Sequence, residues 1–154
     1  RAAFEALEKA LARSRRTGQL VGVIYIDLDK FKPVNDNFGH DAGDIVLSEV
    51  ATRLVESLRE TDTVARIGGD EFVCILEQLD SLNDLESPIR TLLSNINEPI
   101  SLSENIEVTL SVSAGGTVFG KDAEEALQDV VRRADQAMYE AKLKEPGSFK
   151  LMPA

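Results

Sequence analysis

The sequence predicts an α+β fold in which helices cover a central sheet that is mostly antiparallel. Residues 20–26 form a nearly continuous apolar run, which is typical of a buried central strand. The short apolar runs 64–67 and 72–76 are separated by four residues that begin with two glycines, a pattern that indicates a hairpin. Helical periodicity is clearest over residues 123–144. The 154 residues suffice for a single domain, 1–154, with a sizeable core.

Three further helices are predicted along the chain. Residues 1–16 are rich in alanine and place apolar side chains on one helical face, and Thr17-Gly18 is expected to end this helix. Residues 41–59 repeat apolar side chains at helical spacing, and residues 81–97 do so more weakly. Residues 30–40 show neither helical spacing nor the alternation of a strand, so we expect an irregular segment there.

Two more strands are predicted in the second half of the chain. Residues 106–119 alternate apolar and polar side chains until Gly115-Gly116, where we expect an interruption. Pro146-Gly147 is expected to end the last helix, and residues 149–152 suit a short final strand. Helices and strands are thus mixed along the chain around one hairpin, as in an α+β sandwich.

Charge and composition exclude several classes of protein. The net charge of −10, from 27 acidic and 17 basic side chains, argues against a general binder of nucleic acid or anionic membranes. No apolar run approaches the roughly 18 residues of a membrane span. The only cysteine, Cys74, lies in an apolar run, so we expect a buried thiol and a reducing, cytoplasmic location. Because the chain begins inside a helical pattern, we expect a domain excised from a longer multidomain protein, soluble or membrane-anchored.

The segment Gly68-Gly69-Asp70-Glu71 carries the most chemical information. The glycines leave the backbone uncovered, so a bulky ligand can approach closely. Carboxylates at a hairpin tip are hard oxygen ligands that suit a Mg²⁺ ion carrying phosphate. A tight turn with a solvated acidic tip is the alternative interpretation.

Asp27 and Asp29 follow the first predicted strand, and side chains two residues apart point to one side of an extended chain. Since this strand end and the hairpin tip belong to one sheet, we expect Asp27 to lie near Asp70 and Glu71. Carboxylates from two segments, with a backbone carbonyl, form a divalent-cation site. Two such ions can hold the attacking and leaving oxygens of a phosphoryl displacement. Strand-end solvation is the alternative.

Polar side chains are dense over residues 30–44. Lys32 can neutralise phosphate, and the carboxylate of Asp44 together with the amide of Asn35 suits the edge of a guanine base. The only histidine, His40, is by itself typical of a loop or a helix cap.

Four motifs, in this order, resemble the GGDEF family of diguanylate cyclases. The resemblance extends over essentially the whole chain and is specific, because four separate motifs agree in sequence and spacing. The matching segments are 27–36 (DLDKFKPVND), 39–44 (GHDAGD), 66–72 (RIGGDEF) and 134–142 (ADQAMYEAK).

The resemblance implies a palm-like α+β domain related to nucleotidyl cyclases. It implies a reaction that joins two GTP molecules into cyclic di-GMP and releases two pyrophosphates. Because one GTP per domain cannot close a symmetric two-nucleotide ring, two domains must face each other as a homodimer. The implied cofactors are Mg²⁺ or Mn²⁺ ions, two per active site.

The resemblance also implies roles for individual residues. Asp27, Asp70 and Glu71 would bind the metal with help from the Leu28 carbonyl. We choose Asp70 as the base for the GTP 3′-hydroxyl, with Glu71 as the alternative. The residues implied to contact GTP are Asn35, Asp44 and His40 at the guanosine, Lys32 and Lys142 at the phosphates, and the Gly68-Gly69 backbone.

The segment 59–62, Arg-Glu-Thr-Asp, resembles the RxxD site at which the product inhibits many family members. Arg59 can hold phosphate bidentately and stack on a purine, and Asp62 can accept from guanine. Two residues depart from the family: Ile67 stands where an aromatic is frequent, and Pro146 stands where a phosphate-binding arginine is expected. The alternative function is therefore a catalytically weak or inactive domain that binds GTP or cyclic di-GMP and regulates a fused partner.

Overall fold

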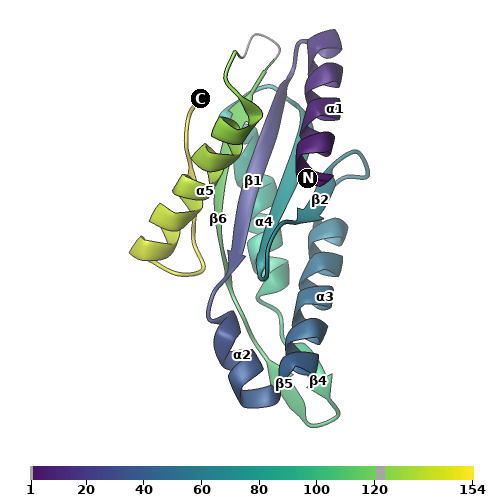
Figure 1. Cartoon of the computed structure of the whole chain (residues 1–154), viewed down its shortest axis with the longest axis vertical. Coiled ribbons are helices and arrows are strands. Elements are labelled where there is room, and N and C mark those ends of the chain that lie inside the picture. Colours follow the sequence, from purple (N-terminus) through teal and green to yellow (C-terminus); the bar gives the residue numbers. More distant parts are fainter. Residues whose placement is uncertain (1, 121–123) are drawn as a thin grey trace.

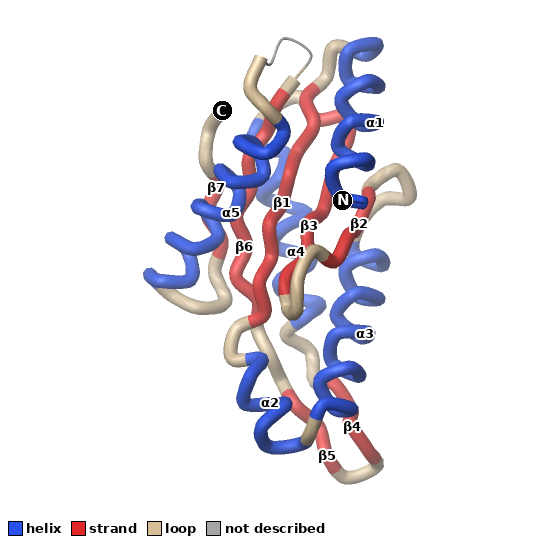
Figure 2. The backbone as a smooth tube through the Cα atoms, in the orientation of Figure 1, coloured by secondary structure: helices blue, strands red, loops and turns tan. Residues whose placement is uncertain are grey.

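A computed structural model describes residues 2–120 and 124–154 (Figure 1). Its centre is a sheet with the strand order β2-β3-β1-β6-β7, in which only the β6–β7 pair is parallel. The strands of this sheet are β1 (Leu20–Leu28), β2 (Thr63–Arg66), β3 (Glu71–Leu79), β6 (Val112–Phe119) and β7 (Phe149–Leu151). A separate hairpin, at the lower end of Figure 2, consists of β4 (Ile100–Ser103) and β5 (Ile106–Val108).

Helices cover both faces of the central sheet. They are α1 (Ala2–Thr17), α2 (Phe31–Phe38), α3 (His40–Ser57), the short 3-10 helix η1 (Leu82–Leu85), α4 (Glu86–Ile96) and α5 (Leu127–Lys144). One face packs against α3 and α4 through a core that includes Ile24 and Phe72. The other face packs against α1 and α5 through Val23 and Tyr25. The sheet is therefore the middle layer of three (Figure 1).

Strand periodicity decides which side chains meet α5. Side chains along β1 alternate between the two faces, so Asp27 lies on the same face as Tyr25. In the antiparallel β1–β3 pair, Asp27 lies opposite Glu71. Like charges placed directly opposite each other destabilise a sheet. The pairing of Asp27 with Glu71 therefore lowers the stability of this end of the sheet.

Helix α5 lies very close to β6 at Gly115. A methyl group at this position would lie 2.2 Å from both the Ala134 carbonyl oxygen and the Met138 backbone nitrogen. Only glycine lets the helix rest on the strand in this way. The predicted interruption at Gly115-Gly116 is wrong, because α5 covers the bare backbone and β6 continues through both glycines.

Other differences from the predictions concern short elements. The predicted strand 106–119 is split into β5 and β6, because β5 pairs with β4 in the separate hairpin whereas β6 pairs with β1 in the central sheet. Residues 30–40 contain α2, whose Pro33 lies in the first turn, where backbone N–H groups have no partner within the helix. The predicted helix 81–97 begins as η1, and β4 was not predicted.

The main predictions are confirmed. The first strand is almost wholly buried, and the hairpin is formed by β2 and β3. Cys74 is buried in β3, and burial raises the pKa of its thiol. Residue 1 of the predicted first helix and residue 123, the predicted start of the last, lie outside the described residues. Within the two described ranges, no helix combines the length and the apolarity that crossing a bilayer requires.

Candidate functional site

Five carboxylates gather where β1 ends and β3 begins, beneath α5. We call this cluster the acidic edge: Asp27, Asp29, Asp70, Glu71 and Asp135. Asp27 and Glu71 are cross-strand neighbours. Burial, followed by the charges of Glu71 and Asp27, raises the pKa of Asp135 on α5. The structure thus brings the acids of the first strand and of the hairpin together, as predicted.

Lys142, near the end of α5, is the cation of the acidic edge. Its Nζ donates to Asp27 Oδ2 at 2.7 Å and to the Leu28 carbonyl oxygen at 3.2 Å. Burial alone would lower the pKa of Lys142, but the hydrogen bond and charge of Asp27 outweigh it, so this pKa lies above its ordinary value. In this structure Lys142 therefore contacts two of the four groups predicted to bind metal, Asp27 and the Leu28 carbonyl.

Asp29 is held from a different side. Its side chain is 4% exposed and accepts from Ser111 Oγ at 2.6 Å and from Ser113 Oγ at 2.8 Å. Its Oδ1 also lies 3.5 Å from Lys142 Nζ. Both serine hydroxyls come from the start of the β6 segment, so Asp29 ties the end of β1 to that strand and contributes to the placement of Lys142.

Burial and the neighbouring charges raise the pKa values of Asp27 and Asp135. Burial is the main cause for Asp27, and the charges of Asp70 and Asp29 add to it, while Lys142 opposes it. Burial again comes first for Asp135, followed by the charges of Glu71 and Asp27. Negative charge is therefore in excess here, a condition that favours cation binding.

Tyr25 is an additional member of the site. Its hydroxyl donates to Glu71 Oε1 at 3.0 Å. Burial, the charge of Asp135 and the hydrogen bond to Glu71 raise the pKa of Tyr25 strongly, so the phenol keeps its proton. A neutral donor thus fixes the orientation of Glu71 among like charges.

The glycine turn is open on the side that a ligand would approach. Arg66 donates to the carbonyl oxygens of Gly68 at 3.0 Å and of Gly69 at 2.7 Å, which holds the turn in one shape. A methyl group at Gly69 would meet no atom within 4 Å. The Asp70 carbonyl accepts from the Leu28 N–H at 3.1 Å, which joins the turn to the end of β1.

The chemistry of this edge fits a divalent cation. Asp27 Oδ1 is buried and has no hydrogen-bond partner. The other carboxylate oxygen and the Leu28 carbonyl both contact an ammonium, which is itself a cation. Over residues 2–120 and 124–154, no three His, Cys, Asp or Glu side chains already converge as a metal site. Since Mg²⁺ takes only one or two carboxylates and completes its shell with water and phosphate, this set is sufficient.

Asn35 and Asp44, the predicted guanine ligands, come from adjacent helices. Asn35 Oδ1 is buried and lacks a hydrogen-bond partner. A methyl group at Gly43 would lie only 1.9 Å from this oxygen. Asp44 is exposed and follows Gly43 directly on α3. Gly43 thus allows α2 and α3 to pack closely. It also places the unpaired Asn35 Oδ1 against the residue that precedes the exposed Asp44.

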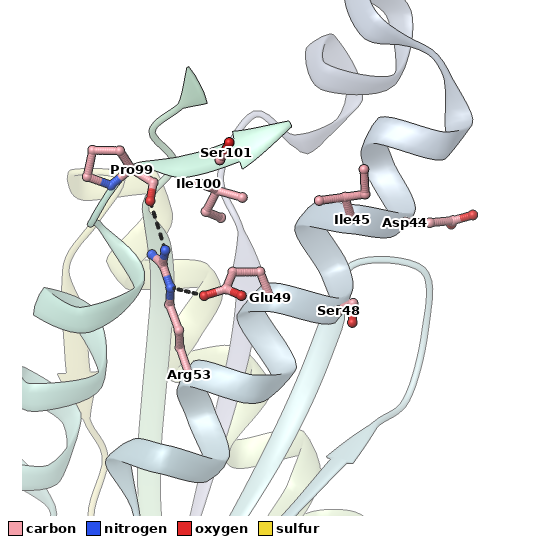
Figure 3. A pocket seen from close by; sticks show the side chains of 8 residues that line it. All are labelled: Asp44, Ile45, Ser48, Glu49, Arg53, Pro99, Ile100 and Ser101. Carbon is pink, nitrogen blue, oxygen red and sulfur yellow. Dashed lines mark hydrogen bonds and ion pairs between the residues drawn. The ribbon is translucent and has the colours of Figure 1, made fainter. Parts of the chain in front are cut away.

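Asp44 borders two hollows in the surface. One, of about 610 Å³, lies between α3 and β4, where Arg53 donates to Glu49 and to the Pro99 carbonyl oxygen (Figure 3). In that view the Asp44 side chain points away from Arg53 and Pro99. The other hollow, of about 390 Å³, lies between α3 and the β2–β3 hairpin. Its lining is Asp44, Leu47, Ser48, Ala51, Val55, Val64, Arg66 and Phe72.

The second hollow suits a flat heteroaromatic ring. Leu47, Val64 and Phe72 give it apolar walls, and Asp44 supplies an acceptor at its border. Asn35 is not among its lining residues. Lys32, on α2, and His40, the first residue of α3, are both exposed to solvent.

The predicted inhibitory pair forms a closed ion pair between α3 and β2. The Asp62 side chain is 1% exposed and accepts from Arg59 Nε at 3.2 Å and Nη2 at 3.1 Å. It also accepts from the backbone N–H groups of Arg59 and Glu77. Arg59 is half exposed, so it is accessible to a ligand, whereas the Asp62 oxygens are already engaged.

Sequence reasoning missed Tyr25, the serine partners of Asp29, and an ion pair at the far end of β3. In that pair, Arg13 Nε and Nη2 donate to the two Glu77 carboxylate oxygens at 2.5 and 2.6 Å. Alternation along β1 could have placed Tyr25 beside Asp27. The other contacts depend on how helices pack on the sheet, and no local pattern reports that.

Comparisons with known proteins agree with this geometry. The family profile described as "Diguanylate cyclase, GGDEF domain" matches residues 1–147. Diguanylate cyclase TpbB of Pseudomonas aeruginosa is 38% identical over 152 residues, which are 98% of this chain and 35% of TpbB. The chain thus spans about a third of that relative's length. Cyclic di-GMP phosphodiesterase NbdA of the same species is 34% identical over 143 residues, which are 92% of this chain and 18% of NbdA.

Solved structures give the same result. The crystal structure of the TpbB GGDEF domain has a TM-score of 0.90 at 38% identity, and the match covers 98% of this chain and 94% of that one. The GGDEF domain of DgcB from Caulobacter crescentus, solved in complex with c-di-GMP, has a TM-score of 0.86 at 25% identity, with coverages of 97% and 88%. The predicted palm-like fold is confirmed. The chain belongs to the GGDEF domain family.

Proposed function

We propose that this domain is a diguanylate cyclase that condenses two GTP molecules into cyclic di-GMP and two pyrophosphates. In each half-reaction, the 3′ oxygen of one GTP bonds to the α-phosphorus of the other. The bond from that phosphorus to pyrophosphate breaks, and the hydroxyl proton passes to a base. Membership of the family and relatives named as diguanylate cyclases support this reaction.

One observation carries the proposal. Asp27 and Glu71 lie opposite each other beside an open glycine turn, and Asp27 Oδ1 is buried without a partner. Such an arrangement weakens the fold. A cation that carries phosphate would relieve both the repulsion and the missing contact.

The proposed metal ligands are Asp27, the Leu28 carbonyl, Asp70 and Glu71. Bound there, Mg²⁺ or Mn²⁺ ions, two per active site, would neutralise phosphate charge and make the 3′-hydroxyl more acidic. Asp70 is the proposed base. Tyr25, through its hydrogen bond to Glu71, keeps that carboxylate oriented.

The nucleotide is proposed to lie between α3 and the hairpin. Asp44 would accept from the guanine N1–H and exocyclic amine, and the amide of Asn35 would meet the same base. His40 would lie close to the nucleoside. Lys32 and Lys142 would bind phosphates, and the bare Gly68-Gly69 backbone would lie against the substrate.

Two copies of the domain are required for this reaction. Each copy presents one GTP, so a symmetric product needs a homodimer in which the two sites face each other. The proposed location is the cytoplasm, where Cys74 stays reduced and GTP is present.

Incubation with GTP and Mg²⁺, followed by chromatography, tests the proposal. Cyclic di-GMP is expected from the unmodified chain and none from Asp70→Asn, whose circular dichroism spectrum should match that of the unmodified chain. Absence of product even when the domain is fused to a dimeric coiled coil would contradict the assignment.

We further propose product inhibition through Arg59. The Arg59 guanidinium is half exposed, and its ion pair with the buried Asp62 fixes its orientation. It can therefore donate to a phosphate of cyclic di-GMP without rearrangement. The DgcB domain solved with c-di-GMP supports binding of this ligand within the family. Arg59→Ala is expected to abolish inhibition by added product. Inhibition that persists unchanged in this variant refutes the site.

A binding module without turnover is the second candidate. Pro146 stands where the family has an arginine, and the Gly147 N–H at this turn is tied to Ser113 Oγ at 3.3 Å. In addition, one relative of this chain is named as a phosphodiesterase, so family membership alone does not decide the activity. Calorimetry with GTP and with cyclic di-GMP separates the candidates, since this one requires binding without product.

A further inference from the structure

Lys142 contacts the same atoms that the proposed metal would bind. Its ammonium lies 2.7 Å from Asp27 Oδ2 and 3.2 Å from the Leu28 carbonyl oxygen, with Asp29 Oδ1 at 3.5 Å. Carboxylate and carbonyl oxygens are also the ligands that Mg²⁺ prefers. The Lys142 ammonium and a metal cation at this site would thus share the same oxygen partners.

A single ammonium does not satisfy this site. Asp27 Oδ1 remains buried without a partner, and the charges of Asp70 and Asp29 still act on the same carboxyl group. A divalent ion brings more charge and more ligand positions than Lys142 does. Lys142 is therefore a replaceable occupant of the site.

The surroundings allow the ammonium to move alone. The Lys142 side chain is 30% exposed, and a lysine has a flexible four-carbon stem. Asp29 is held independently by Ser111 and Ser113, and α5 is fixed on β6 at Gly115. Neither the carboxylates nor the helix has to shift when Lys142 changes partner.

We propose that Lys142 exchanges partners when substrate binds: its ammonium holds Asp27 and the Leu28 carbonyl in the free domain, and it transfers to the phosphates of the incoming metal–GTP complex. This inference rests on the proposed function. A bare ion must displace the ammonium without offering it a new partner, whereas the metal–GTP complex supplies one. Lys142 thereby weakens binding of metal alone and couples it to binding of nucleotide.

Binding of Mn²⁺ alone tests the first half of the exchange. Free Mn²⁺ is measured by electron paramagnetic resonance in about 0.15 M KCl, where charges beyond roughly 8 Å are screened. The matched variants are Lys142→Met and Lys144→Met, which remove the same charge from the same helix; Lys144 is exposed. We expect Lys142→Met to bind bare Mn²⁺ about tenfold more tightly than Lys144→Met and the unmodified domain.

A non-hydrolysable GTP analogue tests the second half. In the unmodified domain and in Lys144→Met, the analogue is expected to tighten Mn²⁺ binding about tenfold or more. In Lys142→Met this enhancement should be smaller, since only the direct contact between metal and phosphate then couples the two ligands. Lys142→Gln, whose side chain is shorter and polar, should repeat both results if the Met variant unfolds.

Several results would overturn the exchange. They are equal affinities of the two Met variants for bare Mn²⁺, absence of Mn²⁺ binding to Lys142→Met, and an undiminished enhancement by the analogue. None of these measurements needs turnover. If the expected affinities appear but no cyclic di-GMP forms, the proposed activity fails and the exchange stands; if product forms but the affinities are equal, only the exchange fails.

Discussion

The acidic edge and the Arg59–Asp62 pair lie toward opposite ends of β3, about 20 Å apart along the strand. They differ in whether the oxygens of their buried carboxylates have hydrogen-bond partners. Asp62 is almost fully buried, and both its oxygens accept from Arg59 or from the backbone. Asp27 has one oxygen without a partner, and burial, with the charges of its acidic neighbours, raises its pKa. A satisfied carboxylate stabilises the fold, whereas an under-satisfied one is available to a ligand.

Substitution of Asp27 is expected to have the largest effect on activity. Asp27→Asn removes a proposed metal ligand, so cyclase activity should fall on the order of 10²–10³-fold. Thermal stability should be retained, because the change also removes repulsion from Asp70 and Glu71. Chromatography and a melting curve report the two quantities. A large loss of stability would show that Asp27 resembles Asp62 after all.

The reverse result is expected for Asp62. Asp62→Ala removes the carboxylate that accepts from the Arg59 guanidinium and from the Glu77 N–H, so stability should fall by about 2–3 kcal/mol. Tm should fall by roughly 4–10 °C, while uninhibited cyclase activity stays within a few fold. Glu60→Ala, in the same exposed loop, is the control and should stay within about 0.5 kcal/mol of the unmodified chain.

Tyr25→Phe sharpens the comparison, because it removes a single donor from the acidic edge. We expect activity to fall about fivefold, the equivalent of one hydrogen bond of about 1 kcal/mol, as Glu71 loses its fixed orientation. The change should appear mainly in kcat at saturating Mg²⁺. Tyr139→Phe, at an exposed tyrosine on α5, should change nothing measurable. Equal kinetics for the two variants would remove Tyr25 from the site.

The smallest expected effect concerns Asp135. Because its folded-state pKa is raised, its contribution to stability is complete below the ordinary value of 3.8 and is lost as pH rises through the raised value. Asp135→Asn should therefore raise Tm near neutral pH, by about 1–2 °C at this partly exposed site. The gain should vanish below pH 3.8. A gain that is independent of pH would contradict the charge-based explanation.

The sequence predicted what depends on local periodicity. Alternation along β1 and the position of the hairpin were enough to place Asp27 near Asp70 and Glu71. The four motifs identified the family, which the comparisons confirm. The roles proposed for individual residues in binding metal, guanine and phosphate stay predictions.

Contacts between the sheet and the helices that cover it could not be predicted from the sequence. Nothing near Lys142 in the sequence indicates that its ammonium contacts Asp27, 115 residues away. Nor does the sequence near Arg53 indicate that its guanidinium donates to four backbone carbonyls between α4 and β4. Helix α2 was missed because residues 30–40 show no helical periodicity, although Pro33 in the first turn and Gly39 after the last are compatible with a short helix.

The close contact of α5 with Gly115 has a consequence for insertions and deletions. The helix is anchored at Ala134 and Met138, and Lys142 follows one turn later on the same face. Each residue added or removed between Met138 and Lys142 would rotate the lysine by about 100° around the helix axis. The turn between Met138 and Lys142 should therefore accept no change of length.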